Sequence, residues 1–210
     1  MTLVDIIKIL LDPQEVVVIL GLVGVIAIIF AETGLFFGFF LPGDSLLFTA
    51  GFLASQDLLP LFPLLVGTLI AAIVGDSIGY WFGKKTGPAI FSREDSFFFR
   101  KKHVESARVF YEKHGKMTII LARFIPVIRT FAPIVAGVAS MNYRVFISYN
   151  IIGGFIWTIG LTLTGYFLGR SIPSADAYLL PIVLLITLVS FMPGIVHILR
   201  ERKNRKNIVQ

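Results

Sequence analysis

The sequence predicts an all-α integral membrane protein, built as an inverted repeat of a re-entrant hairpin plus a transmembrane helix, with an additional C-terminal transmembrane helix. Three observations predict this fold class: an apolar composition, segments long enough to cross a bilayer, and an internal repeat. Of the 210 residues, 56% are hydrophobic and only 15% are charged, whereas soluble domains average about 45–50% and about 25%. A water-soluble fold would leave too much of this apolar surface in water, so the composition excludes one.

The apolar segments match the thickness of a bilayer. A hydrocarbon core of about 30 Å requires about 20 predominantly apolar residues in a helix. Segments of this kind occupy residues 16–31, 34–56, 61–83, 117–139, 145–169 and 177–199. We therefore expect residues 1–210 to form a single membrane domain.

An internal repeat relates the two halves of the chain. An offset of 86 residues aligns GYWFGK, which begins at Gly79, with GYFLGR, which begins at Gly165. The same offset aligns the Ala-Gly pair at Gly51 with the pair at Gly137. One constant offset for several matches predicts two related units rather than chance similarity.

The first repeat is predicted over residues 16–84. Residues 16–56 are too long for one span, and polar or helix-breaking residues interrupt their middle: Glu32, Gly34, Gly38, Pro42, Gly43 and Asp44. We expect a re-entrant hairpin over 16–56 that is entered from the outside of the cell, and a helix over 61–83 that crosses inward.

Two strongly basic segments flank apolar spans. Residues 85–116 and the tail 200–210 are rich in lysine and arginine, which places both in the cytoplasm by the positive-inside rule. Segment 85–116 is also amphipathic, and two arrangements stay open: a helix on the bilayer surface, or an ordinary helix packed against the membrane domain. Because each basic cluster adjoins an apolar span, we expect contact with anionic lipid and no nucleic-acid partner.

The second repeat is predicted over residues 117–170. If 117–139, 145–169 and 177–199 all crossed the bilayer, the basic tail would lie outside the cell, against the charge rule. Segment 117–139 is the one expected not to cross, because Arg123, Pro126, Arg129 and Pro133 interrupt it. Such broken backbone is tolerated where it is buried in protein or lines a watery cavity. We therefore expect a second hairpin, a helix over 145–169 and a C-terminal helix that ends in the cytoplasm.

Four charged residues fall within these hairpins: Glu32 and Asp44 in the first, Arg123 and Arg129 in the second. Each charge costs on the order of 3 kcal/mol at the centre of a bilayer, so they are expected to face each other or a wet cavity. The offset places Arg129 opposite Gly43, next to Asp44. We expect a site near the midplane in which Arg123 and Arg129 hold an anionic head group and Glu32 and Asp44 exchange protons. The alternative is a static set of buried salt bridges.

Two further polar residues are candidates for accessory roles. Asp76 lies before the cytoplasmic end of its helix. It is either a relay residue or, as the more ordinary interpretation has it, a side chain that reaches interfacial water. Asn150 is expected to pack helices together rather than to bind substrate. The chain has no cysteine, and its three histidines lack partners at ligand spacing, so we expect no metal and no cofactor. Without a phosphate loop or a nucleophile motif, we expect no enzyme.

Three segments together resemble a known family: FAETGLFFGFFLPGDSLLFTAG (30–51), GDSIGYWFGKKTG (75–87) and LARFIPVIRTFAPIVAGVASMNYRVFISYNIIGGFIW (121–157). They resemble the signature segments of DedA proteins, of the SNARE-associated Golgi protein (VTT-domain) superfamily. The resemblance implies a multi-pass protein of the bacterial inner membrane with two opposed re-entrant hairpins. It also implies a link to the proton-motive force, membrane homeostasis and resistance to cationic antimicrobials.

In function, the resemblance implies a lipid flippase with undecaprenyl phosphate or phosphatidylethanolamine as substrate. The family's essential charges fall on Glu32, Asp44, Arg123 and Arg129. The expected partners are therefore a membrane lipid and protons, and the oligomeric state stays open, a homo-oligomer included. The main alternative is a proton or cation antiporter in pH and membrane homeostasis. A membrane phosphatase is disfavoured because no histidine lies at membrane depth in a suitable context.

Overall fold

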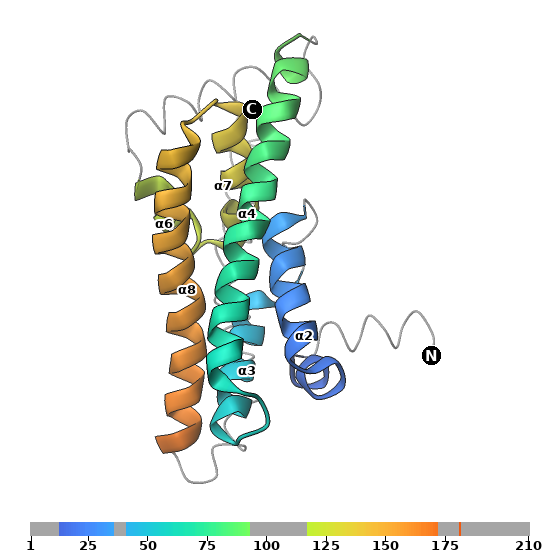
Figure 1. The fold of residues 1–210 in the computed structure, drawn as a ribbon, viewed down its shortest axis with the longest axis vertical. Coiled ribbons are helices and arrows are strands. Elements are labelled where there is room, and N and C mark those ends of the chain that lie inside the picture. The colour runs from blue at the N-terminus through green and yellow to red at the C-terminus, as the bar shows by residue number, and fades with distance from the viewer. Residues whose placement is uncertain (1–12, 36–40, 93–116, 172–180, 182–210) are drawn as a thin grey trace, which may run out of the picture.

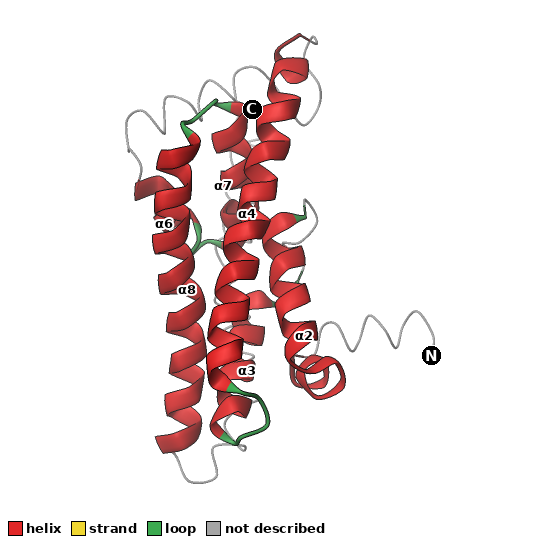
Figure 2. Ribbon diagram, viewed as in Figure 1, coloured by secondary structure: helices red, strands yellow, loops and turns green. Residues whose placement is uncertain are grey.

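The computed structural model describes residues 13–35, 41–92, 117–171 and 181. The described elements are helices, without a strand among them (Figure 2). They are α2 (Pro13–Gly34), α3 (Gly43–Ser55), α4 (Leu61–Ser92), α6 (Met117–Ala122), α7 (Pro126–Val138) and α8 (Tyr143–Ser171). The all-α class expected from the sequence is confirmed over these residues.

Two long helices, α4 and α8, form the frame of the molecule. They contact each other and run in opposite directions along its long axis (Figure 1). Residues Leu61–Gly87 of α4 and Tyr143–Ser171 of α8 are long and apolar enough to cross a membrane. At a rise of about 1.5 Å per residue, these segments of 27 and 29 residues span about 40 Å, more than the hydrocarbon core requires.

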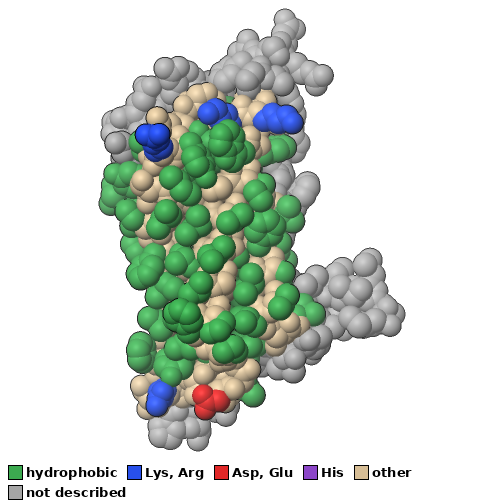
Figure 3. All heavy atoms as spheres, in the orientation of Figure 1, with side chains coloured by type: hydrophobic (Ala, Val, Ile, Leu, Met, Phe, Trp, Pro, Cys, Tyr) green, Lys and Arg blue, Asp and Glu red, His purple; other side chains and the backbone are tan. Residues whose placement is uncertain are grey.

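The outer faces of α4 and α8 are apolar. Phe62, Ile70 and Trp81 on α4 and Phe155 and Phe167 on α8 are each more than half exposed. On the face seen in Figure 3, hydrophobic side chains cover the middle and charged side chains appear only near the two ends. This distribution is typical of a surface that contacts lipid at mid-height and water at its ends.

The first hairpin segment consists of α2 and α3, which pack against each other. Gly21, with φ 59° and ψ −155°, interrupts α2, and the first turns of the helix are seen end on in Figure 1. The left-handed φ at this position favours glycine. The polar break expected in the middle of 16–56 lies between the end of α2 at Gly34 and the start of α3 at Gly43.

The second hairpin segment consists of α6 and α7, separated by a short break at 123–125. Ile125 is extended, with φ −120° and ψ 106°, and Pro126 occupies the first turn of α7. Proline disfavours a helical conformation in the residue before it and is well suited to the start of a helix. The interruption that the sequence predicts in 117–139 is therefore present, and it places Arg123 outside regular helix.

The short helices pack in a crossed arrangement: α3 lies along α8, and α7 along α4. Each short helix thus contacts the long helix of the other predicted repeat. Glycine permits the close approach, because a Cβ at Gly51 would clash with the backbone of α8 and one at Gly137 with the backbone of α4. Gly83 and Gly165 occupy comparable positions on the long helices. Several of the glycines that the 86-residue offset aligns therefore lie at helix contacts.

Several expected elements differ from the structure or lie outside it. The predicted helices 61–83 and 145–169 correspond to α4 and α8, but α4 continues to Ser92, so the start of the predicted basic segment 85–116 is helical. The rest of that segment, the tail 200–210 and, apart from Pro181, the C-terminal helix over 177–199 lie outside the described residues.

Candidate functional site

Five charged side chains meet in the interior of the described bundle. Glu32, Asp76, Arg123 and Arg129 are 1–3% exposed, and the side chain of Asp44 is 18% exposed. They come from the end of α2, the first turn of α3, the middle of α4, the α6–α7 break and the first turn of α7. Buried ions are strongly destabilising unless they are paired. Their partners therefore define the site.

Arg129 holds the first cluster together. Its Nη1 donates to Asp44 Oδ1 at 2.6 Å, and its Nη2 donates to Glu32 Oε1. Its guanidinium carbon lies 4.2 Å from the ring centroid of Trp157, whose Nε1 donates to Asp44 Oδ1 at 2.7 Å. One cation thus connects α2, α3, α7 and α8. We call Glu32, Asp44, Arg129 and Trp157 the Arg129 cluster.

Local sequence explains the geometry of this cluster. Asp44 lies in the first turn of α3, where the amide groups of the helix N-terminus favour a carboxylate. A Cβ on Gly43 would occupy the position of the Glu32 carboxylate. Glycine at that position is therefore required for the two acids to approach the same arginine.

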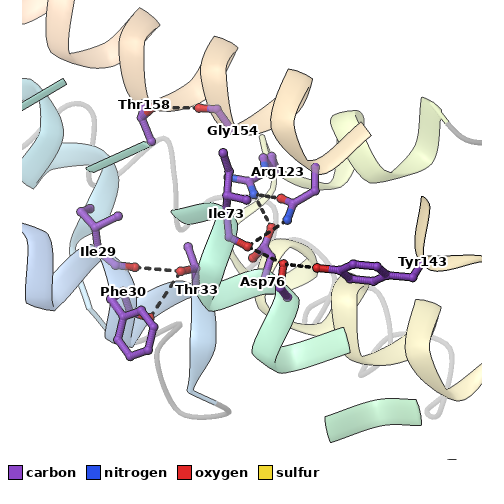
Figure 4. A network of polar contacts seen from close by, with 11 residues as sticks. Ile29, Phe30, Thr33, Ile73, Asp76, Arg123, Tyr143, Gly154 and Thr158 are labelled. Atoms are coloured by element: carbon purple, nitrogen blue, oxygen red, sulfur yellow. Dashed lines mark hydrogen bonds and ion pairs between the residues drawn. The ribbon is translucent and has the colours of Figure 1, made fainter. Parts of the chain in front are cut away.

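Arg123 forms a second cluster. Its Nη2 donates to Asp76 Oδ2 and to Asn150 Oδ1, and the Asn150 amide donates in turn to the carbonyl of Ile73 at 3.1 Å. Figure 4 shows the Arg123 side chain reaching Asp76 of α4. We call Asp76, Arg123 and Asn150 the Arg123 cluster. It connects α4, α8 and the α6–α7 break.

Trp157 links the two clusters. Its ring centroid lies 4.2 Å from the guanidinium carbon of Arg129 and 5.9 Å from that of Arg123, both within the range of a cation–π interaction. The indole is 2% exposed, so both contacts are shielded from bulk water. The clusters therefore form one continuous buried site.

The site is acidic in balance and not fully hydrogen-bonded. Three carboxylates and two guanidiniums leave one negative charge in excess when all of them are ionised. Several atoms have no hydrogen-bond partner in the described part of the chain: Glu32 Oε2, Asp76 Oδ1, Arg123 Nε, Arg123 Nη1 and Arg129 Nε. Because buried polar atoms are nearly always paired in proteins, these five atoms are exceptions among the described residues.

The structure brings together most of the residues that the sequence singles out. Arg129 contacts Asp44 and Glu32, in line with the expectation that charges in the two segments face each other or a wet cavity. Arg123 does not join these acids; it pairs with Asp76. The expectation that Asp76 reaches interfacial water is wrong, because its residue is 2% exposed and ion-paired.

Asn150 and Trp157 contribute more than sequence reasoning assigned to them. Asn150 does join helices, through Ile73 on α4, but it also binds Arg123. Trp157 was not expected in the site. The only available signal was general: a buried tryptophan usually finds a partner for its N–H group.

Comparison with known proteins identifies relatives of this chain. Residues 41–167 match the sequence model of the VTT domain. The chain is 47% identical to Protein DedA of Escherichia coli (strain K12) over 178 residues, which cover 84% of this chain and 81% of that protein. It is 45% identical over 192 residues to an uncharacterized membrane protein of Mycobacterium tuberculosis (strain ATCC 25618 / H37Rv), covering 89% and 82% of the two chains.

A third relative is an uncharacterized membrane protein of Mycobacterium leprae (strain TN), 44% identical over 171 residues that cover 81% of this chain and 76% of that protein. No solved structure matches. The VTT match includes Asp44, Asp76, Arg123 and Arg129, so most of the buried site lies within the family's domain. The chain therefore belongs to the VTT-domain family and is a membrane protein of the DedA family.

Proposed function

We propose that this chain is a lipid flippase of the bacterial inner membrane, linked to the proton-motive force, which translocates undecaprenyl phosphate or phosphatidylethanolamine. One observation carries the proposal: two buried arginines with unused N–H groups lie among an excess of carboxylates, between helices long enough to cross a bilayer. Buried charge at membrane depth is functional by default.

The arginines favour a phosphate ligand. A guanidinium is planar and always charged, and its N–H groups match the spacing of phosphate oxygens. The surrounding helices expose apolar side chains such as Ile70 and Phe155. A lipid phosphate combines a head group for the arginines with an acyl or prenyl chain for this outer surface.

The carboxylates favour proton exchange coupled to lipid binding. With one negative charge in excess, the fully ionised site repels an incoming phosphate. Protonation of Glu32 and Asp44, the two partners of Arg129, would remove this repulsion. Asp44 is the most exposed acid of the site, which suits a first point of contact with water.

The topology that accompanies this proposal has two opposed re-entrant hairpins, α2–α3 and α6–α7, related as an inverted repeat. The crossed packing of α3 on α8 and of α7 on α4 supports it. Lys84 and Lys85, in the C-terminal part of α4, and Arg144, at the start of α8, are exposed, and Arg170 is exposed at the other end of α8. The positive-inside rule assigns the first end to the cytoplasm, and the basic C-terminal tail with it.

A proton or cation antiporter is the second candidate, and the excess of carboxylate favours it. In that case the acids bind the ion and the arginines are structural counter-charges. The two functions differ in what the lipid composition does. An antiporter moves ions in vesicles of any composition, whereas a flippase moves one lipid class.

The test uses the full chain reconstituted in liposomes. A fluorescent polyprenyl phosphate, the matching uncharged polyprenol and a fluorescent phosphatidylethanolamine are followed between leaflets by quenching from one side. The proposal expects movement of a phosphate-bearing lipid, without movement of the polyprenol. Ion flux without movement of either phosphate-bearing lipid would establish the antiporter instead.

A further inference from the structure

The two arginines differ in which of their nitrogens are hydrogen-bonded. Arg129 uses both terminal nitrogens on carboxylates and lies against the Trp157 ring, so only its Nε lacks a partner among the described residues. Arg123 makes both of its hydrogen bonds through Nη2. Its Nε and Nη1 are without partners in the described chain. Each guanidinium makes two of these hydrogen bonds and has three further N–H groups, but in Arg123 the three lie on Nε and Nη1, so one terminal nitrogen is wholly without a partner among the described residues.

The unused donors of Arg123 lie beside two glycines of α8. An ideal Cβ on Gly154 would lie 3.4 Å from Nη1 and 3.5 Å from the guanidinium carbon, and one on Gly153 would lie 3.4 Å from Nε. Any other residue at these positions would place a side chain against the guanidinium. The absence of side chains keeps room next to the donors that have no partner.

Asn150 holds Arg123 by a bond that does not depend on protonation. Its amide oxygen accepts from Arg123 Nη2, and its amide nitrogen is anchored on the carbonyl of Ile73. An amide is neutral at every physiological pH, whereas the other partner, Asp76, is a carboxylate. Arg123 therefore stays oriented by Asn150 whether or not Asp76 holds it.

We propose that Arg123 is the side chain that contacts the phosphate of the transported lipid, and that Arg129 is a fixed cation that joins the two hairpin segments. Asp76 competes with the phosphate for Arg123, and Asn150 is a positioning residue for the guanidinium. This assignment rests on the proposed function and gives the two arginines different roles within it.

Substitution of Gly154 by alanine tests this assignment with little disturbance of the fold. The added methyl group meets its neighbours at 3.4–3.5 Å, an ordinary contact distance, but fills the room beside Nη1. Gly160→Ala on the same helix is the matched control, because nothing lies within 4 Å of its ideal Cβ. The measurement is binding of a fluorescent polyprenyl phosphate to the purified full chain in nanodiscs, with the matching polyprenol and unlabelled phosphatidylethanolamine as competitors.

We expect Gly154→Ala to weaken binding of the polyprenyl phosphate by about tenfold or more, the loss of one hydrogen bond to a charged group. Gly160→Ala should bind like the unaltered chain. Competition by phosphatidylethanolamine would identify a phospholipid phosphate as a ligand; its failure would assign the site to the polyprenyl phosphate. Unchanged binding in Gly154→Ala would overturn the assignment.

Two sets of substitutions by uncharged side chains separate the arginines. Arg123→Gln with Asp76→Asn should abolish the preference for polyprenyl phosphate over polyprenol. Arg129→Gln with Glu32→Gln and Asp44→Asn should lose transport but keep that preference. The reverse result would overturn the assignment. If either set fails to fold, as judged by thermal melting of tryptophan fluorescence, the Gly154→Ala comparison decides alone.

The binding measurements distinguish a wrong role for Arg123 from a wrong flippase proposal. If the unaltered chain binds polyprenyl phosphate and polyprenol equally and phosphatidylethanolamine does not compete, lipid phosphate recognition is rejected, and the assignment with it. If the unaltered chain prefers a lipid phosphate and only the Arg129 cluster controls that preference, the flippase proposal survives and the role of Arg123 is wrong.

Discussion

Replacement of Arg129 by glutamine should destabilise the protein more than any other single change at the site. The substitution leaves the Glu32 and Asp44 carboxylates facing each other at 1% and 18% exposure without the cation between them. Removal of one partner of a buried ion pair costs about 3–5 kcal/mol. Loss of the guanidinium from the Trp157 ring, 4.2 Å away, adds about 0.5–2 kcal/mol. We expect the free energy of unfolding to fall by about 3–5 kcal/mol, because glutamine restores part of the hydrogen bonding.

The assay is reversible unfolding of the purified chain in mixed micelles, as the fraction of denaturing detergent is raised. Lys85→Gln is the matched control, since it removes an exposed cation near the end of α4 and should change stability by less than about 0.5 kcal/mol. The triple substitution of Arg129→Gln, Glu32→Gln and Asp44→Asn should recover most of the loss, because no uncompensated charge remains. Equal stability of Arg129→Gln and Lys85→Gln would refute this account of the Arg129 cluster, as would a triple variant no more stable than the single one.

Three further outcomes are expected. Trp157→Phe keeps an aromatic ring but removes the N–H that donates to the Asp44 carboxylate at 2.7 Å. The free energy of unfolding should therefore fall by about 1.5–3 kcal/mol, and unchanged stability in the same micelle assay would contradict this. Gly137→Ala forces a methyl group into the backbone of α4 and should destabilise by about 1–3 kcal/mol, with Gly160→Ala as a near-neutral control; equal effects would show that α4 and α7 do not approach closely. Because the chain has no cysteine, Lys85→Cys and Arg170→Cys report sidedness. A membrane-impermeant maleimide should label only the second in intact cells, and labelling of both from outside would contradict the antiparallel crossing.

The contact between Arg129 and the first hairpin segment is the part of the site that the sequence predicts best. An offset of 86 residues places Arg129 opposite Gly43, and the structure places it 2.6 Å from Asp44. The reasoning succeeds because the cost of unpaired charge in hydrocarbon leaves few arrangements open. The acids Glu32 and Asp44 and the base Arg129 are therefore expected to form ion pairs.

The Arg123 cluster is not predictable in the same way. Its partners Asp76 and Asn150 lie on α4 and α8, and their positions depend on the rotation and register of two long helices. Neither helix has a marked amphipathic pattern that would indicate which face is buried, because both the lipid side and the protein side are apolar. Composition therefore identifies the spans but does not show that Asp76 points inward.

Some helix boundaries can likewise be predicted from the sequence and others cannot. The break before α7 is predicted from Pro126, whose effect on the preceding residue is local. The end of α4 is not: Lys84 and Lys85 mark the end of the apolar span, but lysine does not terminate a helix, and α4 continues to Ser92. The lysines thus mark the end of the predicted apolar span, but they do not mark the end of the helix.

The most direct test of the central claim, that a lipid phosphate and protons share one buried site, measures both in the same liposomes. Transport of a fluorescent polyprenyl phosphate or phosphatidylethanolamine is followed by one-sided quenching while a pH-sensitive dye reports internal proton concentration, with and without an imposed pH gradient. We predict that lipid movement and proton movement occur together, that the gradient accelerates both, and that Asp44→Asn abolishes the acceleration. Lipid movement at the same rate with and without the gradient, unaccompanied by protons, would contradict the account.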